Sequence, residues 1–331
     1  MLKHSSMISA AAVLGAAILW GTVGPAQVLA GSPSDPAALG AARLLVGGAV
    51  LTLPVLRSFP WRALAAPGAW QWVLAAAAST AIYQATFLYG VKLSGAALGT
   101  AVALGCAPFA TGVFSWWWGG QRPGRQWLGG TAAAVGGCAL ILLPAGSVHI
   151  DPLGFTFAVV AGCCYGAYTV AAKRLLDTGA PTTASMATTL LIGGLLLSPF
   201  LARQPGHLVL PSTVALIVWM GVVGTAVAYT FFGRGLTATT AATAGTLSLA
   251  EPLTATLLGV VVLGEHLTPT AITGCTLLLA GLFAANFPAR RRASSSTPPP
   301  GTPLTGTPLA AGPVDDGRLA AVRDRGATTS C

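Results

Sequence analysis

The chain has 331 residues and a formal net charge of +9, with 54% hydrophobic and only 8% charged residues. A soluble domain carries roughly 25% charged residues because its surface faces water, so this composition excludes an ordinary soluble protein and indicates an integral membrane protein. The 17 basic residues stand singly or in short groups between apolar runs, which predicts a lipid bilayer as partner and excludes a nucleic-acid footprint.

Ten apolar segments are long enough to cross a bilayer, which takes about 20 residues at 1.5 Å rise per residue. In chain order we predict spans at 8–30, 36–56, 69–90, 96–118, 126–144, 153–172, 183–201, 211–233, 239–263 and 268–287. The fold class is therefore an all-α integral membrane protein, and the short connectors predict that consecutive helices are neighbours and mostly antiparallel. The six cysteines show no CxxC and no Cys/His ligand spacing, so neither a metal site nor a cofactor is predicted.

The basic residues also predict the orientation in the membrane. With the N-terminus inside, eleven Lys and Arg residues fall at inner ends and loops, whereas the outer loops hold only Lys92 and Arg203. This positive-inside asymmetry predicts that both termini are cytoplasmic, with residues 1–7 as a short N-terminus and 288–331 as a disordered tail rich in Pro, Ser and Thr. Arginine exceeds lysine 14 to 3 and Ala and Gly abound, a composition typical of a GC-rich bacterium and hence of its plasma membrane.

The chain repeats itself at an offset of 144 residues. Thr86-Phe87 aligns with Thr230-Phe231, and Pro108 with Pro252, without a gap. We therefore predict a first repeat at 8–144, a linker at 145–152 and a second repeat at 153–287, each with five spans. Five is an odd number, so the second repeat must enter the membrane from the opposite side. Inverted repeats of this kind recur in secondary transporters, where rocking of the halves exposes a central site to each face in turn.

Three stretches resemble the EamA-domain proteins of the drug/metabolite transporter superfamily. "SLAEPLTATLLGVVVLGEHLTPTAITGCTLLLAGL" resembles the closing signature of that family, "ILWGTVGP" its first-helix signature, and Arg43 in "ALGAARLLVGG" its second-helix arginine. The resemblance covers roughly 8–287 and implies ten helices, cytoplasmic termini, paired repeats and movement of small metabolites, often outward. The first repeat departs from the pattern, because it has Gln121 where the second has Glu265.

Glu251 lies at the centre of the predicted span 239–263, next to Pro252. An acid at that depth costs roughly 2.5–3.5 kcal/mol even on the mildest scale, so its side chain should face the bundle interior. Pro252 lacks an N–H and loosens the helix, which is tolerated where protein or water satisfies the freed carbonyls. The pair predicts a wet central site in which Glu251 couples proton exchange to substrate. The structural alternative is a glutamate paired with a hydroxyl or with Arg43.

Other polar and aromatic side chains within the spans are candidates for a substrate cavity: Trp20, Arg43, Tyr83, Gln84, Thr86, Tyr165, Tyr168 and Tyr229. Tyr165 and Tyr168 share one helix face at i and i+3. The Arg43 guanidinium could bind a substrate carboxylate through two hydrogen bonds, or extend outward and brace the bundle. For the tyrosines, cavity lining and packing are both open. Pro108 and Pro252 are matched hinge candidates, with static kinks as the alternative.

We therefore expect a carrier that exports small metabolites, such as amino acids or related solutes, by proton antiport. An uptake carrier and a drug exporter are variants of the same fold. The rival class is a membrane-embedded lipid- or prenyl-modifying enzyme, but such chemistry needs clustered acids to hold Mg²⁺, and the five acids before residue 288 are at least fourteen residues apart. A channel or sensor would not call for an inverted repeat with a mid-span acid. No oligomeric state is predicted.

Overall fold

The computed structural model describes residues 2–120, 122–143, 151–203, 205–264 and 266–286. Most of the predicted linker at 145–152, the tail at 288–331, Gln121 and Glu265 lie outside the described residues.

The described part of the chain is helical and holds no β-strand. Before the linker the elements are α1 (Leu2–Gly21), α2 (Val23–Ala30), α3 (Pro36–Thr52), the 3₁₀ helix η1 (Leu53–Ser58), α4 (Trp61–Leu64), α5 (Trp70–Ser94), α6 (Ala96–Gly119) and α7 (Arg125–Leu142). After it they are α8 (Pro152–Asp177), α9 (Thr182–Leu197), η2 (Ser198–Ala202), α10 (Pro205–Leu208), α11 (Pro211–Gly221), η3 (Val222–Val227), α12 (Ala228–Ala238), α13 (Ala241–Leu247), η4 (Ser248–Ala250), α14 (Glu251–Leu263) and α15 (Pro269–Asn286).

Eight helical stretches of the described chain are long and apolar enough to cross a membrane. The helices α5, with 25 residues, and α7, with 18, occupy the predicted spans 69–90 and 126–144 but are not among these eight. A multi-pass membrane protein is therefore confirmed. Four bounds differ most from expectation. α1 already begins at Leu2, α5 continues to Ser94, α8 to Asp177 and α12 to Ala238, which places Lys92, Lys173 and Arg234 within helices.

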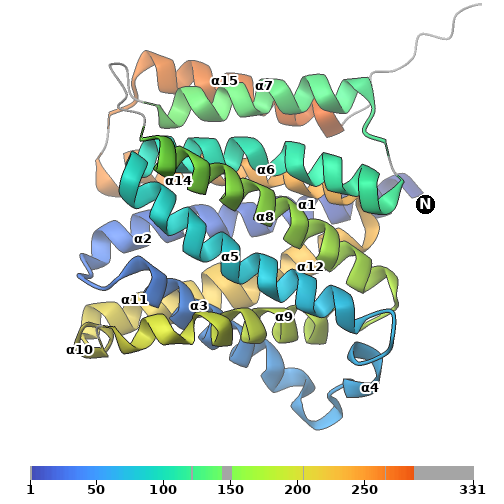
Figure 1. Ribbon diagram of the computed structural model, residues 1–331. Coiled ribbons are helices and arrows are strands. Elements are labelled where there is room, and N and C mark those ends of the chain that lie inside the picture. The colour runs from blue at the N-terminus through green and yellow to red at the C-terminus, as the bar shows by residue number, and fades with distance from the viewer. Residues whose placement is uncertain (1, 121, 144–150, 204, 265, 287–331) are drawn as a thin grey trace, which may run out of the picture. The chain divides into compact units, whose positions relative to one another are not determined.

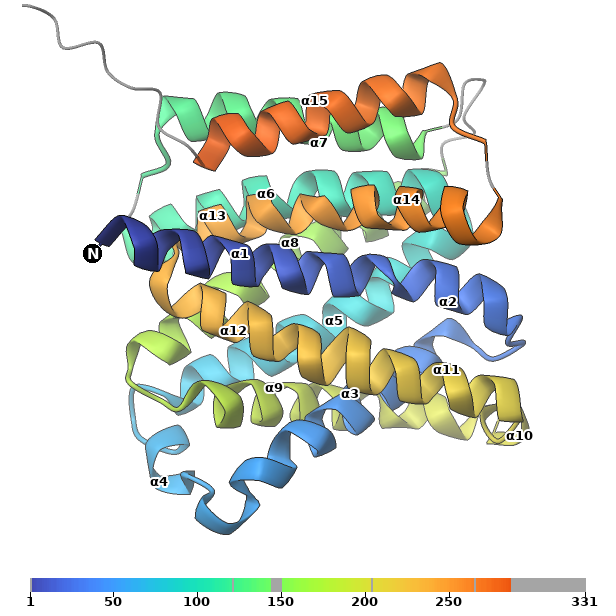
Figure 2. The ribbon, with the colours of Figure 1, turned by 180° about the vertical axis from the view of Figure 1, so that it is seen from behind.

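The helices pack in pairs that are distant in sequence. α7 lies along α15, α5 and α6 both lie along α8, α3 packs on α9, and α1 packs on α12. Figures 1 and 2 show the α7–α15 pair at one edge of the bundle, and Figure 1 shows α8 beside α5 and α6. The largest core cluster draws on α1, α3, α5, α8, α9 and α12 and includes the fully buried Leu44, Leu190 and Phe232.

Glycines allow the close contact between α7 and α15. A methyl group at Gly137 would overlap the backbone nitrogen of Leu278 on α15, and one at Gly281 would overlap the backbone nitrogen of Ala134 on α7. In lipid, where neither helix gains by hiding apolar surface from water, close backbone packing of small residues drives helix association. This contact therefore depends on the absence of side chains at these two positions.

The two matched prolines lie in different local structures. α6 continues through Pro108 without interruption, whereas Pro252 follows a break at which α13 ends and the 3₁₀ turn η4 leads into α14. A second irregularity is the π-helical stretch η3, where the Thr225 hydroxyl donates to the Met220 carbonyl at 2.8 Å. Such interruptions of the helical hydrogen-bond ladder are frequent at functional sites, and η4 and η3 directly precede Glu251 and the helix of Tyr229.

Candidate functional site

Four helices bring the predicted aromatic residues into one cluster. The Trp20 ring of α1 lies 6.5 Å from the ring of Tyr165 on α8 and 5.4 Å from the ring of Tyr229 on α12, centroid to centroid, edge to face in both cases. Tyr83 of α5 is 5.9 Å from Tyr165, and Tyr168 is 5.9 Å from Tyr229. These separations are typical of favourable aromatic pairs. Of the five, Tyr83 and Tyr165 are half-buried and the others are buried.

Sequence reasoning missed two members of this cluster. Phe232 is fully buried on α12 and lies 5.4 Å from Trp20 and 6.3 Å from Tyr168. Its spacing from Tyr229 is i+3, the same pattern that drew attention to Tyr165 and Tyr168, so the signal was present. Ser248, in η4, accepts a 2.7 Å hydrogen bond from the Tyr165 hydroxyl. No local pattern reveals a partner 83 residues away.

Arg43 points into the bundle. Its Nη2 donates to the Gln84 side-chain oxygen at 3.4 Å, a long hydrogen bond, and its Nε is buried without a partner. Gln84 is buried on α5, and Gly40 leaves it room, since a methyl group at Gly40 would come within 2.8 Å of the Gln84 amide nitrogen. A buried donor without an acceptor costs free energy, roughly 1–3 kcal/mol. The guanidinium therefore retains hydrogen-bonding capacity that the described protein does not use.

Glu251 begins α14 immediately after η4. Its side chain is half-buried and makes no hydrogen bond or ion pair with the described residues. α1 packs close to its backbone, because a methyl group at Gly21 would come within 2.7 Å of the Glu251 carbonyl oxygen. The expected structural alternative, pairing with a hydroxyl or directly with Arg43, therefore has no counterpart in the described contacts.

Arg43 and Glu251 are nevertheless electrostatic neighbours. The two charges interact, yet no Arg43 nitrogen lies within 4.0 Å of a Glu251 oxygen. Tyr83 and Tyr229 each interact electrostatically with both charged groups, which places all four side chains in one site. A forked cation and a carboxylate that interact electrostatically without forming an ion pair can together hold a ligand that carries both charges. The described residues hold no group of three or more His, Cys, Asp or Glu that could bind a metal.

Thr86 contributes less to this site. Its hydroxyl donates to the Ile82 carbonyl of its own helix at 2.7 Å, and the side chain is half-buried on α5. The hydroxyl is thus already used by the helix, a common arrangement for threonine in apolar helices.

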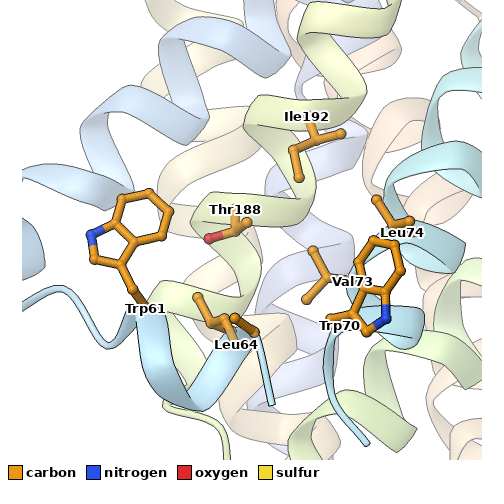
Figure 3. A pocket seen from close by; sticks show the side chains of 8 residues that line it. Trp61, Leu64, Trp70, Val73, Leu74, Thr188 and Ile192 are labelled. Carbon is orange, nitrogen blue, oxygen red and sulfur yellow. The ribbon is translucent and has the colours of Figure 1, made fainter. Parts of the chain in front are cut away.

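Two pockets open away from these residues, beside η1 and α4. They measure about 410 and 290 Å³ and share Trp61, Thr188 and Ile192 in their walls. Figure 3 shows the larger one, with Trp61 and Trp70 on opposite sides of Thr188. None of the predicted site residues lines either pocket.

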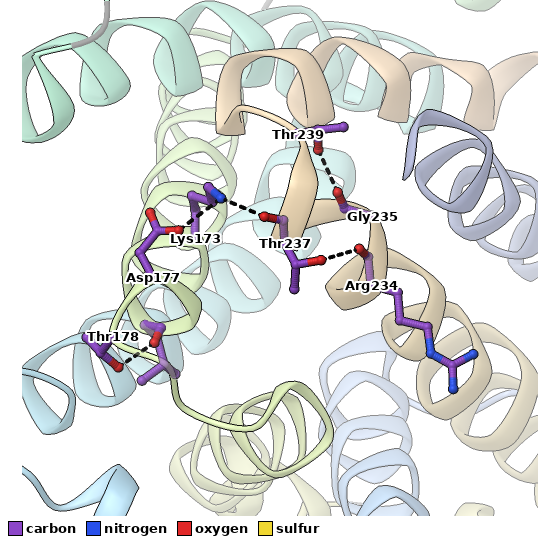
Figure 4. Close-up of polar contacts among 8 residues, drawn as sticks. Lys173, Asp177, Thr178, Arg234, Gly235, Thr237 and Thr239 are labelled. Carbon is purple, nitrogen blue, oxygen red and sulfur yellow. Dashed lines mark hydrogen bonds and ion pairs between the residues drawn. The ribbon is translucent and has the colours of Figure 1, made fainter. Parts of the chain in front are cut away.

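One polar link fixes the two helices that carry most of the aromatic cluster. Lys173, near the end of α8, makes a 2.9 Å ion pair with Asp177 and donates to the Thr237 carbonyl of α12 at 3.1 Å. Figure 4 shows Lys173 between these two acceptors, and Arg234 pointing away from them. The Lys173–Thr237 contact joins α8 and α12, the helices that carry Tyr168 and Tyr229.

Comparison with known proteins places these observations in a family. The model of the EamA-like transporter family matches the chain twice, over residues 7–143 and 152–287. An uncharacterized transporter of Bacillus subtilis, YwfM, is 38% identical over 285 residues, which cover 86% of this chain and 95% of YwfM. The threonine/homoserine exporter RhtA of Escherichia coli K12 is 28% identical over 210 residues, 62% of this chain and 68% of RhtA. A solved protein structure shares the fold with a TM-score of 0.73 at 23% identity, over 86% of this chain and 96% of the solved one.

Proposed function

The chain belongs to the EamA-like transporter family, and we propose that it exports small zwitterionic amino acids from the cytoplasm in exchange for protons. Membership makes it a multi-pass membrane transporter and not an enzyme, which removes the lipid- or prenyl-modifying alternative. The solute class, the direction and the coupling ion are the proposed part. Its plasma-membrane location and the cytoplasmic position of both termini, inferred from the charge asymmetry, belong to the same proposal.

The proposed architecture has ten crossings in two inverted repeats, 8–144 and 153–287. It requires that α5 and α7 also cross the membrane. Two observations support it. The family model matches the chain twice. The packing pairs also agree with the 144-residue offset. The offset relates α5 to α12 and α1 to α8, and the contact of α5 with α8 is matched by that of α12 with α1. It also relates α7 to α15 and α3 to α9, and the two helices of each of these pairs pack on each other. A pseudo-twofold axis in the membrane plane would produce such reciprocal contacts.

The pair of unmatched opposite charges at the centre carries the substrate proposal. A neutral amino acid has a carboxylate for the Arg43 fork and an ammonium group for Glu251, so it satisfies both with no net charge brought into the membrane. The Tyr165–Ser248 hydrogen bond and the surrounding rings supply a polar and aromatic wall for the side chain. RhtA, which is named as an amino-acid exporter, supports this solute class.

Proton exchange follows from competition at one carboxyl. Glu251 has no protein partner among the described residues, so it can hold a proton or face the substrate ammonium, but not both. If the site reopens to the other side of the membrane only after a proton has replaced the substrate, or the substrate a proton, the two move in opposite directions. The break at η4 and Pro252 would let the start of α14 move between the two states, which keeps Pro252 as the better hinge candidate and leaves Pro108, inside the uninterrupted α6, as the weaker one.

Competition by modified substrates tests the zwitterion site. In vesicles containing the purified full chain, uptake of radiolabelled threonine would be measured against excess threonine, threonine amide, which lacks the carboxylate, or N-acetylthreonine, which lacks the ammonium. We expect threonine to compete at least tenfold better than either analogue, since hydrogen bonds to charged groups are worth about 1.5–3 kcal/mol.

The variant Arg43→Gln should remove the preference for threonine over threonine amide and keep the preference over N-acetylthreonine. Arg234→Gln is the matched control, because Arg234 is exposed and lies away from the site. If wild type ignores threonine and moves apolar cations instead, the chain is a drug exporter. If threonine enters cells only when this chain is present, the protein is an uptake carrier.

A further inference from the structure

The two pockets beside η1 and α4 form one apolar groove on the side of the bundle, outside the central site. They share Trp61, Thr188 and Ile192 in their walls, and their other lining residues come from the end of α3, from η1, from α4 and the residues that flank it, and from α5 and α9. α9 belongs to one of the stretches that can cross a membrane. Trp61, Trp70 and Leu56 are 68%, 53% and 62% exposed, so the groove opens toward lipid rather than into the bundle.

Aromatic residues and a basic connector mark the depth of this groove. η1 and α4 lie at the end of the bundle where α1 begins (Figure 2). Tryptophan prefers the boundary between lipid tails and headgroups, and here Trp61 and Trp70 flank the opening, as Figure 3 shows. Thr188 lies six residues into α9, about 9 Å from its start at 1.5 Å per residue. The groove thus spans the headgroup boundary and the first part of the acyl chains.

Charge at the groove is positive and uncompensated. Arg57, in the last turn of η1, and Arg62, in α4, are both exposed and make no ion pair or hydrogen bond with the described residues. The sequence holds no Asp or Glu between residues 36 and 150 or between 178 and 250, which includes every segment that lines the groove. Asp177, which precedes α9 at the end of α8, pairs with Lys173. An anion at this position has no acidic competitor.

The largely apolar wall includes the hydroxyls of Thr52 and Thr188, and that of Thr52 donates to the Gly48 carbonyl at 2.8 Å. The Thr188 hydroxyl oxygen is buried and has no hydrogen-bond partner. A buried hydroxyl without a partner is uncommon and calls for an unplaced ligand or water. At this depth, the ester carbonyl of a glycerophospholipid is the acceptor that the bilayer supplies.

We propose that the groove binds an anionic phospholipid of the cytoplasmic leaflet. One acyl chain lies between Trp61 and Trp70 against Ile192, the Thr188 hydroxyl donates to an ester carbonyl, and Arg57 and Arg62 hold the phosphate and the anionic headgroup. The apolar walls suit an acyl chain, the unpartnered hydroxyl suits the ester region, and the two arginines, on the η1 and α4 segments that also contribute to the walls, suit an anionic headgroup. The inference does not depend on which solute the protein carries.

Retention of lipid by the purified full chain tests this site. The protein would be equilibrated with equal amounts of phosphatidylglycerol and phosphatidylcholine of identical acyl chains, and retained lipids would be counted by native mass spectrometry. We expect phosphatidylglycerol to be retained at least tenfold over phosphatidylcholine. The double variant Arg57→Gln, Arg62→Gln should abolish this preference, since each arginine near an anionic surface contributes roughly fivefold and the two together about thirtyfold.

Two further variants separate binding from folding. Thr188→Val keeps the shape and removes the hydroxyl, and should lower retention of both lipids about fivefold without lowering the melting temperature. Arg234→Gln, an exposed arginine on another helix, should retain lipid like wild type. Equal retention of the two lipids by wild type would overturn the proposal. So would displacement of phosphatidylglycerol by inorganic phosphate alone, or occupation of the groove by a second copy of the chain.

Discussion

Replacement of Glu251 by glutamine isolates the role of the central carboxyl. Glutamine has nearly the same shape, and Glu251 makes no hydrogen bond or ion pair with the described residues that the change would break. Placing a charge at membrane depth costs about 2.5–3.5 kcal/mol, partly offset here by Arg43, so Glu251→Gln should be as stable as wild type or up to ~2 kcal/mol more stable.

The coupling expected from proton exchange has a defined size. One pH unit is worth about 1.36 kcal/mol, so a one-for-one exchange accumulates solute about tenfold across a gradient of one unit. Glu251→Gln should accumulate none above equilibrium. It should also fail to exchange threonine against threonine efficiently, because the ammonium group loses its carboxylate partner.

The assay uses vesicles with an acidic interior and a membrane potential clamped to zero with valinomycin and equal potassium on both sides. Uptake of labelled threonine is followed to its plateau with and without the pH gradient. Asp177→Asn is the matched control, since it removes a carboxyl that lies at the end of α8, away from the site, and it should accumulate threonine like wild type. A tenfold plateau with Glu251→Gln would refute proton coupling through this residue.

Three smaller predictions concern packing and hydrogen bonds. Gly137→Leu should lower the stability of the folded protein by about 3 kcal/mol or prevent its accumulation in the membrane, because even a methyl group there would overlap α15. The control Gly129→Ala, at a position where nothing lies within 4 Å, should be neutral in a thermal-stability assay. Tyr165→Phe should cost about 1 kcal/mol in the same assay, and Ser248→Ala somewhat more, since it leaves the Tyr165 hydroxyl unpaired. The double variant should cost less than the sum of the two single variants, and an additive result would refute the hydrogen bond. Asp177→Asn should change stability by less than about 0.5 kcal/mol, as expected of an exposed i,i+4 ion pair. A larger loss would show that the ion pair with Lys173 stabilises the protein more than this.

Much of the fold could be predicted from hydropathy. The helical stretches fall within a few residues of the predicted spans, and Glu251-Pro252 stood out because a charge and a missing backbone donor are both costly in lipid. The irregular backbone expected at this pair is present as the turn η4. Pro108 was expected to match Pro252 as a hinge candidate, but α6 continues through it without interruption.

The membership of the candidate site depended on tertiary structure. In a soluble helix the polar face shows which side meets water, but a membrane helix is apolar on its lipid-facing and protein-facing sides alike, so its rotation cannot be read from the pattern. That rotation is set by close contacts such as Gly137 against Leu278, which the chain forms only when distant helices meet.

The sequence by itself therefore determined that this protein crosses the membrane repeatedly, that its basic residues favour one side, and that Glu251 and Arg43 stand out as charges within spans. Only the tertiary structure decided that these two charges influence each other without forming an ion pair, that Ser248 rather than a nearer residue meets Tyr165, and that Trp61 and Trp70 come together with α9 in one groove. The physical reason is that transfer of a side chain into lipid depends on that residue alone, whereas a binding site depends on the relative rotation of helices that are far apart in the chain.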